Sequence, residues 1–446
     1  MARQLLVRMY NVGLGDCIYV RVPDGQQDVH ILIDCGNKFG SLDLLGERIA
    51  ELKKELPDAG DGRKRLDLLV VSHPHEDHHK GFEEEFFKDL KIGNIWLSPA
   101  FNREDPKAKG FHALQSTAQR ALQGLSGITS GEIQEEAAEL LSLSKEEAID
   151  MLCHTLPKAN GIQSLYVSAD TPQARLQIFK DKSISLKVVG PMQDIDAYYL
   201  GGEGLPGTSD ELAPQGLADA YSRMLGSSLP AKGKFPRNIS AQDFKRLQGR
   251  IGSNALAVAE LAGHVTNNLS VVLLLEWHGR RLLFTGDAEW DGANLGAVKK
   301  GRANGSWNVM WQERRELLNK PLDFLKVGHH GSENATPWTG KKYKGKPHPI
   351  NAILDAILPL PAPGKRPTAR AVVSTRRTTK WPTIPNAPLL AEIARRVANV
   401  SSKYDDGRSS KAVPRNIPQP QRTDLEEKLA GKPLPYIELS FPPRAK

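Results

Sequence analysis

A short apolar segment that runs directly into a cluster of polar side chains limits what this chain can fold into. The mostly apolar residues 66–71 have the composition of a strand buried on both faces, and SHPHEDHHKG follows at once. Apolar strands alternate with helical segments along the chain, which indicates an α/β fold whose loops at the strand ends carry the chemistry. The segment therefore predicts a functional site at the end of this strand.

The loop after this strand has the spacing of a metal site. It carries His73, His75, Asp77 and His78 in the pattern H-x-H-x-D-H. Alternate residues of an extended segment point the same way, so His73 and His75 can converge on one metal ion. Asp77 and His78 can reach a second ion nearby. Neutral imidazoles and a carboxylate suit divalent metals such as zinc, whereas a polar loop without metal is the alternative.

Three further motifs follow the same order as the expected strands. ILIDCG contains Asp34, LLFTGDAE contains Asp287, and LKVGHHGS contains the neighbours His329 and His330. With H-x-H-x-D-H, this series resembles the metallo-β-lactamase-fold hydrolases. The resemblance implies an αββα sandwich of two mixed sheets that holds two divalent ions, zinc or manganese. It also implies that Asp34 supports the histidine loop without binding metal and that Asp287 bridges the two ions.

One branch of this family is especially similar. NVGLGD, NNLSVVLLLE, FTGDAE and LKVGHHGS resemble the metallo-β-lactamase domain attached to bacterial DNA-uptake channels, over residues 1–100 and about 262–400. No channel segment accompanies them, because the longest apolar run, residues 269–275, is far shorter than the ~20 residues of a spanning helix. The resemblance implies a metal-dependent phosphodiesterase that cleaves DNA or RNA through water activated by two ions.

Two positions of the expected site leave alternatives open. The histidine that completes the first metal site in the family has no clean match here: His264 in LAGHVTNNLSVV is one candidate, and Asn268 with Ser270 fits the DNA-uptake branch equally well. His329 and His330 should diverge at a strand end, and His330 is favoured as the ligand because H-G-S resembles the family's ending. We expect Asp77, Asp34 and His330 to act in catalysis, and Asn268 and Ser332 to contact substrate.

The charge distribution suggests the partner. The net charge is +8, yet residues 341–446 carry 21 Lys and Arg against 8 Asp and Glu, so the preceding part is mildly acidic. A basic region suits a polyanion, with nucleic acid the first candidate, although a solvated basic surface is the alternative. Lys341, Lys342 and Lys344 follow the late histidines and are expected to line the approach to the site.

The chain divides into a core and two additions. Residues 1–101 and 262–400 are expected to form the core, 102–261 a mostly helical and irregular insertion, and 401–446 a basic, Pro-rich extension. The three cysteines form no C-x-x-C pair, and the first residues lack the apolar stretch of a secretory signal, so a cytoplasmic location is expected. Strands are expected at residues 4–10, 17–22, 29–34, 163–168, 184–189, 269–276, 280–285, 323–327, 371–374 and 436–441. Helices are expected at residues 42–56, 311–319 and 388–398.

Three functions of different classes remain open at this stage. A nuclease or phosphodiesterase is the first, a hydrolase of a small ester, amide or thioester the second, and a non-catalytic metal-binding regulatory module the third. The long insertion is positioned to cover the site. Within it, residues 226–238, GSSLPAKGKFPRN, have the composition of a protease-sensitive loop. An autoinhibitory lid released by a partner protease near Lys232, Lys234 or Arg237 is one expectation, and a part of the substrate cleft is the other.

Overall fold

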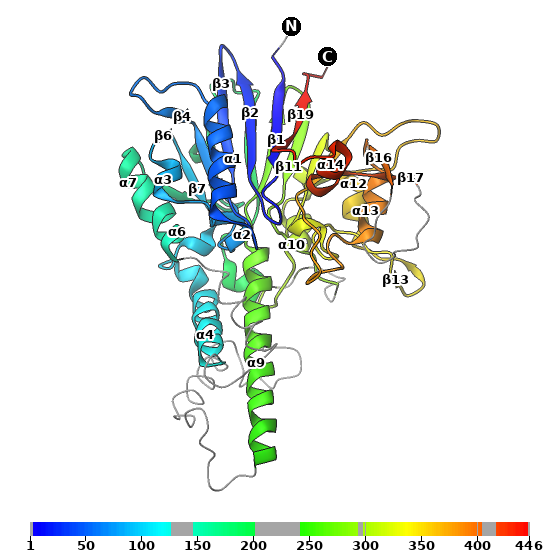
Figure 1. Ribbon diagram of the computed structural model, residues 1–446. Helices are drawn as coiled ribbons and strands as arrows, with labels where there is room; N and C mark the ends of the chain where they lie inside the picture. Colours follow the sequence, from blue (N-terminus) through cyan, green and yellow to red (C-terminus); the bar gives the residue numbers. More distant parts are fainter. Residues whose placement is uncertain are drawn as a thin grey trace.

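Alternating runs of Val, Ile and Leu build two large mixed β-sheets in the computed structural model, which describes residues 3–125, 146–200, 241–292, 298, 300–398, 400–403 and 416–444 (Figure 1). The seven-stranded sheet has the order β19-β1-β2-β3-β5-β7-β8, antiparallel from β19 to β3 and parallel from β3 to β8. Its strands are β1 (Leu5–Tyr10), β2 (Ile18–Asp24), β3 (Gln27–Ile33), β5 (Leu68–Val71), β7 (Ile95–Leu97), β8 (Ser164–Tyr166) and β19 (Tyr436–Phe441).

The six-stranded sheet has the order β18-β15-β12-β11-β10-β9. It is antiparallel from β9 to β11 and parallel from β11 to β18. Its strands are β9 (Ser185–Gly190), β10 (Val272–Trp277), β11 (Arg280–Phe284), β12 (Phe324–Val327), β15 (Arg370–Val373) and β18 (Gln421–Arg422). The α/β class expected from the sequence is therefore confirmed, and both sheets are mixed.

Three apolar clusters hold the layers together. The two sheets face each other across one cluster, to which β1, β2 and β3 contribute Val7, Val20 and Ile31 and the other sheet contributes Leu273 and Phe324. The outer face of the first sheet packs against α1 (Leu42–Glu55), and that of the second against α10 (Ser306–Glu313), α12 (Asn351–Ile357) and α13 (Ala387–Ala394). The order of layers is helix, sheet, sheet, helix, because central strands such as β1, β5 and β12 are buried along their whole length and so have both faces covered.

Two predicted elements differ in detail from the observed ones. Residues 66–71, expected as one strand, are split at Asp67. β4 (Lys64–Leu66) pairs with β6 (Leu90–Ile92), while β5 enters the large sheet. The carboxylate of Asp67 accepts a hydrogen bond from the backbone of His30 at 2.8 Å, which anchors the break. The helix expected at residues 311–319 is two helices, α10 and α11 (Arg315–Leu318).

The expected insertion and extension both supply strands to the sheets. β8 and β9, within residues 102–261, are edge strands of the two sheets, and β18 and β19, within 401–446, are the opposite edges. Residues 401–446 were expected to be mostly irregular with one late strand. The structure corrects this, because β18 and α14 (Thr423–Ala430) also lie there, and Arg422 is buried in an ion pair with Asp424 at 2.7 Å.

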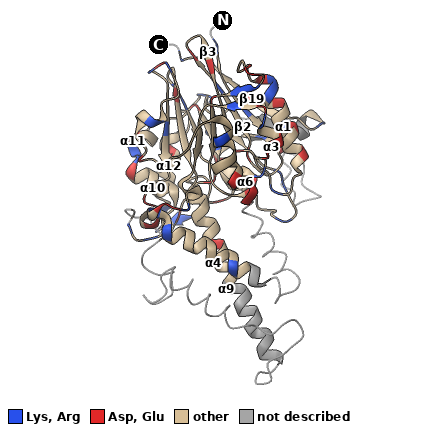
Figure 2. Cartoon of the chain, turned by 90° about the vertical axis from the view of Figure 1, so that its left-hand side faces the viewer, with Lys and Arg blue, Asp and Glu red and all other residues tan. Residues whose placement is uncertain are grey.

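The two longest described helices of residues 102–261 extend from one end of the sandwich (Figure 1). Helix α4 (Lys109–Leu125) packs along α9 (Ala241–Asn268), and Figure 2 shows few charged side chains on their described parts. α3 (Glu84–Phe87), α6 (Glu146–Asp150) and α7 (Leu156–Asn160) instead contribute to the apolar cluster that α1 forms with the outer face of the first sheet. Residues 226–238, the expected protease-sensitive loop, lie outside the described residues. Among the described helices, none is both long and apolar enough to cross a bilayer.

Candidate metal centre

The residues of interest follow the carboxyl ends of five strands. Asp34 follows β3, the histidine loop follows β5, Asp287 follows β11, His330 follows β12 and Ser374 follows β15. Parallel strands bring their carboxyl ends to the same edge of a sheet, and ligand sites of α/β proteins form there. Two sheets that pack face to face therefore place all five loops at one end of the sandwich.

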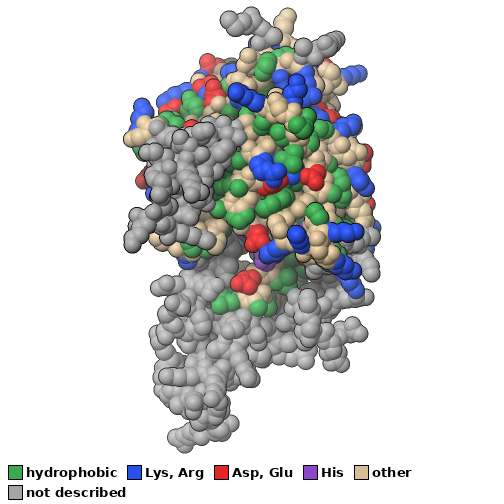
Figure 3. Space-filling model, turned by 90° about the vertical axis from the view of Figure 1, so that its right-hand side faces the viewer, with side chains coloured by type: hydrophobic (Ala, Val, Ile, Leu, Met, Phe, Trp, Pro, Cys, Tyr) green, Lys and Arg blue, Asp and Glu red, His purple; other side chains and the backbone are tan. Residues whose placement is uncertain are grey.

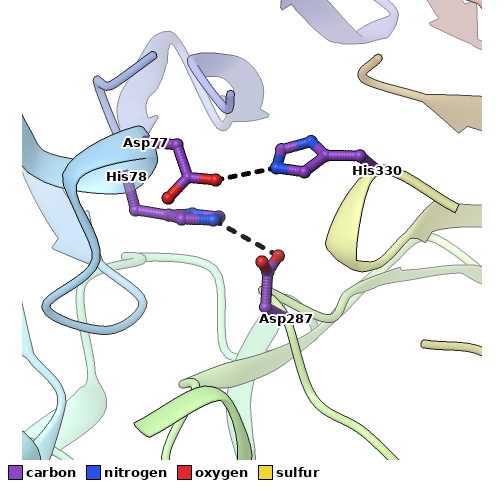
Figure 4. Close-up of side chains that lie close together, drawn as sticks. All are labelled: Asp77, His78, Asp287 and His330. Carbon is purple, nitrogen blue, oxygen red and sulfur yellow. Dashed lines mark hydrogen bonds and ion pairs between the residues drawn. The ribbon is translucent and has the colours of Figure 1, made fainter. Parts of the chain in front are cut away.

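Four buried side chains from three of these loops form a ligand group. Asp77, His78, Asp287 and His330 each offer one nitrogen or carboxylate oxygen, and these atoms all lie within 4.8 Å of one another. His330 Nε2 lies 2.8 Å from Asp77 Oδ2, and His78 Nε2 lies 3.3 Å from Asp287 Oδ1 (Figure 4). Imidazole nitrogens and carboxylate oxygens in this number are the donor set of a divalent transition metal.

The outer nitrogen of each histidine is already used, which points the other toward a cation. His78 Nδ1 donates to Asp34 Oδ2 at 2.8 Å, and His330 Nδ1 donates to the carbonyl of Ser374 at 2.9 Å. His78 Nε2 is buried without a hydrogen-bond partner among the described residues. In the neutral tautomers, His78 Nε2 and His330 Nε2 each carry a lone pair that faces a carboxylate. A divalent cation among them satisfies all four side chains, as in other carboxylate–histidine–metal arrangements.

The pKa shifts of His78 and Asp77 agree with a cation-binding role for the group. Burial opposes the charge on His78, but Asp287 and Asp34 raise the pKa of His78 well above its usual value. Burial also opposes ionisation of Asp77, yet the bond to His330 and the charge of His78 hold the pKa of Asp77 well below its usual value. The site thus concentrates negative charge that a proton neutralises, and a metal ion can take the place of that proton.

Asp34 supports the histidine loop and lies outside the four-residue group, but with Asp16 and His78 it forms a second buried set of ligand atoms within 4.8 Å of one another. Its carboxylate accepts from the backbone and hydroxyl of Ser72 at 2.6 and 2.7 Å, as well as from His78. Asp34 therefore lies behind the imidazole of His78, in the supporting place that the resemblance implies. Burial raises the pKa of Asp34, and its contact with His78 opposes that rise.

His73 and His75 form a second pair directly beside the ligand group, since the ring centroids of His73 and His78 lie 4.2 Å apart. His73 Nε2 lies 3.0 Å from His75 Nδ1, while His73 Nδ1 contacts the hydroxyls of Ser72 and Ser270 at 3.0 and 3.2 Å. Burial lowers the pKa of His73 well below its usual value and that of His75 to about 4, so both rings are neutral ligands near pH 7. Within the described residues, no third His, Cys, Asp or Glu brings a ligand atom within 4.8 Å of both.

The two neighbouring late histidines diverge, as the sequence predicts. His329 and His330 have left-handed φ angles of 43° and 53°, and they are followed by Gly331 at 80°. His330 enters the ligand group, whereas His329 Nδ1 lies 3.3 Å from Glu289 and its Nε2 lies 4.0 Å from Asp287. His329 is thus next to the group without being a member of it.

The structure places His264 and Asn268 differently from the expectation. Both lie on the last turns of α9 and not in a loop, because ALAVAELAGHV repeats apolar residues at helical spacing. His264 Nδ1 contacts Glu289 at 2.8 Å, its side chain is 59% exposed, and it is absent from the ligand group. Asn268 Oδ1 accepts from the backbone of Ser306 at 2.6 Å and of Glu289 at 3.3 Å, so its amide ties α9 to two loops.

The remaining predicted substrate residues lie beside the late histidines. Ser332 is buried, and its hydroxyl donates to Asn334 at 3.0 Å. Lys341, Lys342 and Lys344 belong to the exposed hairpin of β13 (Lys342–Tyr343) and β14 (Lys346–Pro347). Figure 3 shows Lys and Arg side chains next to a histidine at the edge of a hollow on this side of the molecule. Lys341 pairs with Glu333 at 2.9 Å, which keeps one lysine of the hairpin near Ser332.

Sequence reasoning missed three charged residues of the site. Lys326 is fully buried and pairs with Asp16 of NVGLGD, and its Nζ lies 3.9 Å from Asp287. Glu289 binds both His264 and His329, and these bonds outweigh its burial and lower the pKa of Glu289 to about 2. A signal existed for Lys326: a lysine inside an apolar strand expected to be buried on both faces has to be buried with a partner.

A cavity of about 390 Å³ opens beside His75. Its walls come from the segment after β7, from α4 and from the last turns of α9. Phe101 and Leu122 are among its apolar residues, and Arg103, His112 and Gln119 are among its polar ones. Helices of the expected insertion therefore build one wall of the space next to the histidine loop.

The sequence was also compared with protein-family models and with curated proteins. Neither comparison finds a match. The fold and the side-chain geometry therefore carry the argument about function.

Proposed function

We propose that this chain is a metal-dependent hydrolase of the metallo-β-lactamase fold that cleaves phosphodiester bonds in nucleic acid. The observation that carries the proposal is the buried group of Asp77, His78, Asp287 and His330, in which the free imidazole nitrogens face carboxylates. The motif order that resembles the family places its residues at one end of two facing mixed sheets.

A metal ion at this site fits the residues present. The four-residue group would hold one ion, and His73 with His75 would contribute to a second next to it. Bound divalent cations supply acidified water and stabilise the charge that builds up on a phosphoryl group. The chain's own residues position this chemistry: Asp34 fixes the ring of His78, and the carbonyl of Ser374 fixes the ring of His330.

A nucleic-acid substrate is supported by the charge around the site. The hairpin after Ser332 carries Lys341, Lys342 and Lys344, and Lys346 follows them. The loop after β15 adds Arg376, Arg377 and Lys380. Clustered cations next to a metal centre attract a polyanion and raise its local concentration.

The small-substrate alternative has one observation in its favour. The cavity beside His75, at about 390 Å³, is in the size range of pockets that enclose small ligands. Its lining mixes apolar side chains with Gln119 and with Arg103, whose charge is paired with Glu146 at 2.7 Å, which would suit an uncharged ester or amide. Hydrolysis of a panel of small esters, amides and thioesters, with nucleic acid left intact, would favour this alternative.

The test compares two aspartate variants in a cleavage assay. Purified protein is incubated with plasmid, single-stranded DNA or RNA plus manganese or zinc, and its metal content is measured by mass spectrometry. Asp77→Ala should lose most bound metal and at least ~100-fold in cleavage, since one ligand of a buried site is removed. The matched control is Asp89→Ala, an exposed carboxylate that pairs with Lys53 at 3.3 Å.

Two results of this assay would contradict the proposal. Cleavage by Asp77→Ala at the wild-type rate would contradict the assigned site. Nucleic acid that stays intact with every metal tested would contradict the assigned substrate.

A further inference from the structure

Two aromatic side chains from distant parts of the sequence meet at the surface. The ring centroids of Phe39 and Trp381 lie 5.2 Å apart with an interplanar angle of 46°. Phe39 is 54% exposed, the largest value among the exposed large apolar residues of the described chain. An exposed aromatic pair of this kind is an unusual use of apolar surface unless something packs on it.

The backbone at Phe39 is in a costly conformation. Its φ angle is 62°, in the left-handed region that a bulky side chain disfavours by roughly 1–2 kcal/mol. The neighbouring Gly40 is packed so tightly that a Cβ there would lie 2.2 Å from the side chain of Asn37. Strain of this kind persists at sites where the position of a side chain matters.

Both loops that carry this pair are anchored at the metal centre. Phe39 lies three residues after Gly36. Gly36 packs so closely on the histidine loop that a Cβ added there would lie 2.4 Å from the backbone of Asp77 and His78. Trp381 lies in a loop that starts at Ser374, the partner of His330, and returns where the backbone of Asn386 donates to the carbonyl of Gly331 at 2.8 Å. The two loops that carry the aromatic pair are therefore both anchored on residues of the candidate metal centre or on their direct neighbours.

Positive charge surrounds the two rings. Lys38 Nζ lies 4.3 Å from the ring centroid of Trp381 and 5.9 Å from that of Phe39, and Lys380 Nζ lies 5.8 Å from that of Phe39. Residues 374–385 contain Arg376, Arg377 and Lys380 and no acidic residue.

We propose that Phe39 and Trp381, with Lys38 and Lys380, form a stacking platform for an unpaired base of the nucleic-acid strand that is cleaved. The inference rests on the proposed function and deepens it by naming the substrate form as unpaired. The exposed ring of Phe39 takes the base, Trp381 supports that ring from the side, and the lysines attract the phosphates on either side of it.

The physical reason for a preference for unpaired strands is access to the base face. Every base has a π-face that can stack on an aromatic ring, but in a duplex both faces are covered by neighbouring base pairs. Stacking on an aromatic side chain contributes about 1–3 kcal/mol per base. Loss of the platform should therefore weaken single-strand binding about 5- to 150-fold, while duplex binding, which depends on phosphate contacts, stays nearly unchanged.

The test measures binding without cleavage. Fluorescence anisotropy of labelled oligothymidylate, oligouridylate and a blunt duplex of matched length is recorded with full-length protein in a metal chelator. Phe39→Gly combined with Trp381→Ala is the disrupting variant. Glycine accepts φ 62° without strain, so Phe39→Gly alone should keep or raise thermal stability and still lose affinity. Trp381→Phe, which keeps an aromatic ring, should retain most of the single-strand affinity.

The matched control is Leu360→Ala. Leu360 is 46% exposed and lies before the amino end of β15, at the opposite end of that strand from Ser374. It should leave all three affinities unchanged. Equal losses on the thymidine and uridine strands indicate that the platform recognises bases in both DNA and RNA, and a loss on one strand alone assigns it to that sugar.

The outcomes separate the two proposals. Unchanged single-strand affinity in the double variant, or an equal loss on the duplex, would overturn the platform even if the protein cleaves nucleic acid. A selective single-strand loss in a protein that cleaves nothing would support the platform and contradict the proposed nuclease activity.

Discussion

Replacement of the buried Lys326 by methionine is the most direct test of how this end of the sandwich is held together. Lys326 lies in β12 with no exposed surface, and its Nζ pairs with Asp16 and lies 3.4 Å from the carbonyl of Gly286. Burial opposes the charge on this ammonium, but Asp16 and Asp287 together raise the pKa of Lys326 above its usual value. Lys326→Met keeps the apolar stem and removes the charge.

The expected loss of stability follows from the charges left behind. Across the 3.9 Å between Lys326 Nζ and Asp287 Oδ1, a unit-charge attraction at an effective dielectric constant near 20 is about 4 kcal/mol. Removal of one partner from a buried pair costs about 3–5 kcal/mol. The carboxylate of Asp16 stays buried without its nearest counter-charge, and His78 Nδ1 at 3.7 Å is its remaining cationic neighbour. We therefore expect Lys326→Met to lose about 3–5 kcal/mol in the free energy of unfolding.

Urea unfolding followed by circular dichroism, in a metal chelator, measures this loss. Asp16→Asn combined with Lys326→Met removes both charges and should be less destabilised than the sum of the two single variants. The control is Lys341→Met, whose pair with Glu333 is exposed (79% and 55%) and should contribute within about 1 kcal/mol. A Lys326→Met protein as stable as the wild type would refute the assignment of a charged buried pair.

Four further results are expected. Folding lowers the pKa of Glu289 from 4.5 to about 2, so its ionised carboxylate should contribute about 3 kcal/mol to the free energy of unfolding above pH 4.5. This contribution should disappear as the pH falls from 4.5 to 2, and Glu289→Gln should flatten that part of an acid-unfolding curve. Gly36→Ala, whose Cβ would meet the backbone of Asp77 and His78 at 2.4 Å, should lower both metal content and melting temperature, whereas Gly263→Ala, in open space on α9, should not. Alanine at Lys341, Lys342, Lys344 and Lys346 should reduce the slope of log affinity against log salt for DNA by up to about 3; an unchanged slope would mean that these lysines are only solvated. Trypsin cleavage within residues 226–238 should raise metal-dependent cleavage of DNA if the insertion restrains the site, and equal or lower activity would favour a substrate cleft.

Much of the metal centre was predictable because its ligands are local in sequence. His73, His75, Asp77 and His78 occupy six consecutive positions after a strand, and a short polar loop after an apolar run is visible without any structure. Asp287 and His330 were predicted from motif order, and both belong to the same buried group as Asp77 and His78. Spacing alone, however, does not show whether His73 and His75 have a third ligand.

The parts that were missed depend on contacts between distant segments. Asp16 and Lys326 are recognisable as a pair only once β12 lies next to the loop after β1, because neither residue shows its partner in its own motif. His264 was one of two open candidates for the first metal site, and only the structure shows that it lies on α9 with Nδ1 2.8 Å from Glu289. Local pattern identifies an element, but tertiary packing decides where a helix ends and which polar groups are paired.

The pairing of β1 with β19 has a consequence for synthesis of the protein. Leu5 lies opposite Phe441, and 430 positions separate the paired residues Arg8 and Glu438, so β1 finds one of its two partners only after this long intervening segment has been synthesised. Until then one edge of β1 has open backbone donors and acceptors, which are available to any other extended chain. Because Tyr10 is continuous with the loop that bears Asp16, the support for the metal site is also completed late. A nascent chain stalled before residue 436 should therefore aggregate readily and show no metal-dependent activity, so that the order of translation itself delays activity until β19 has been made.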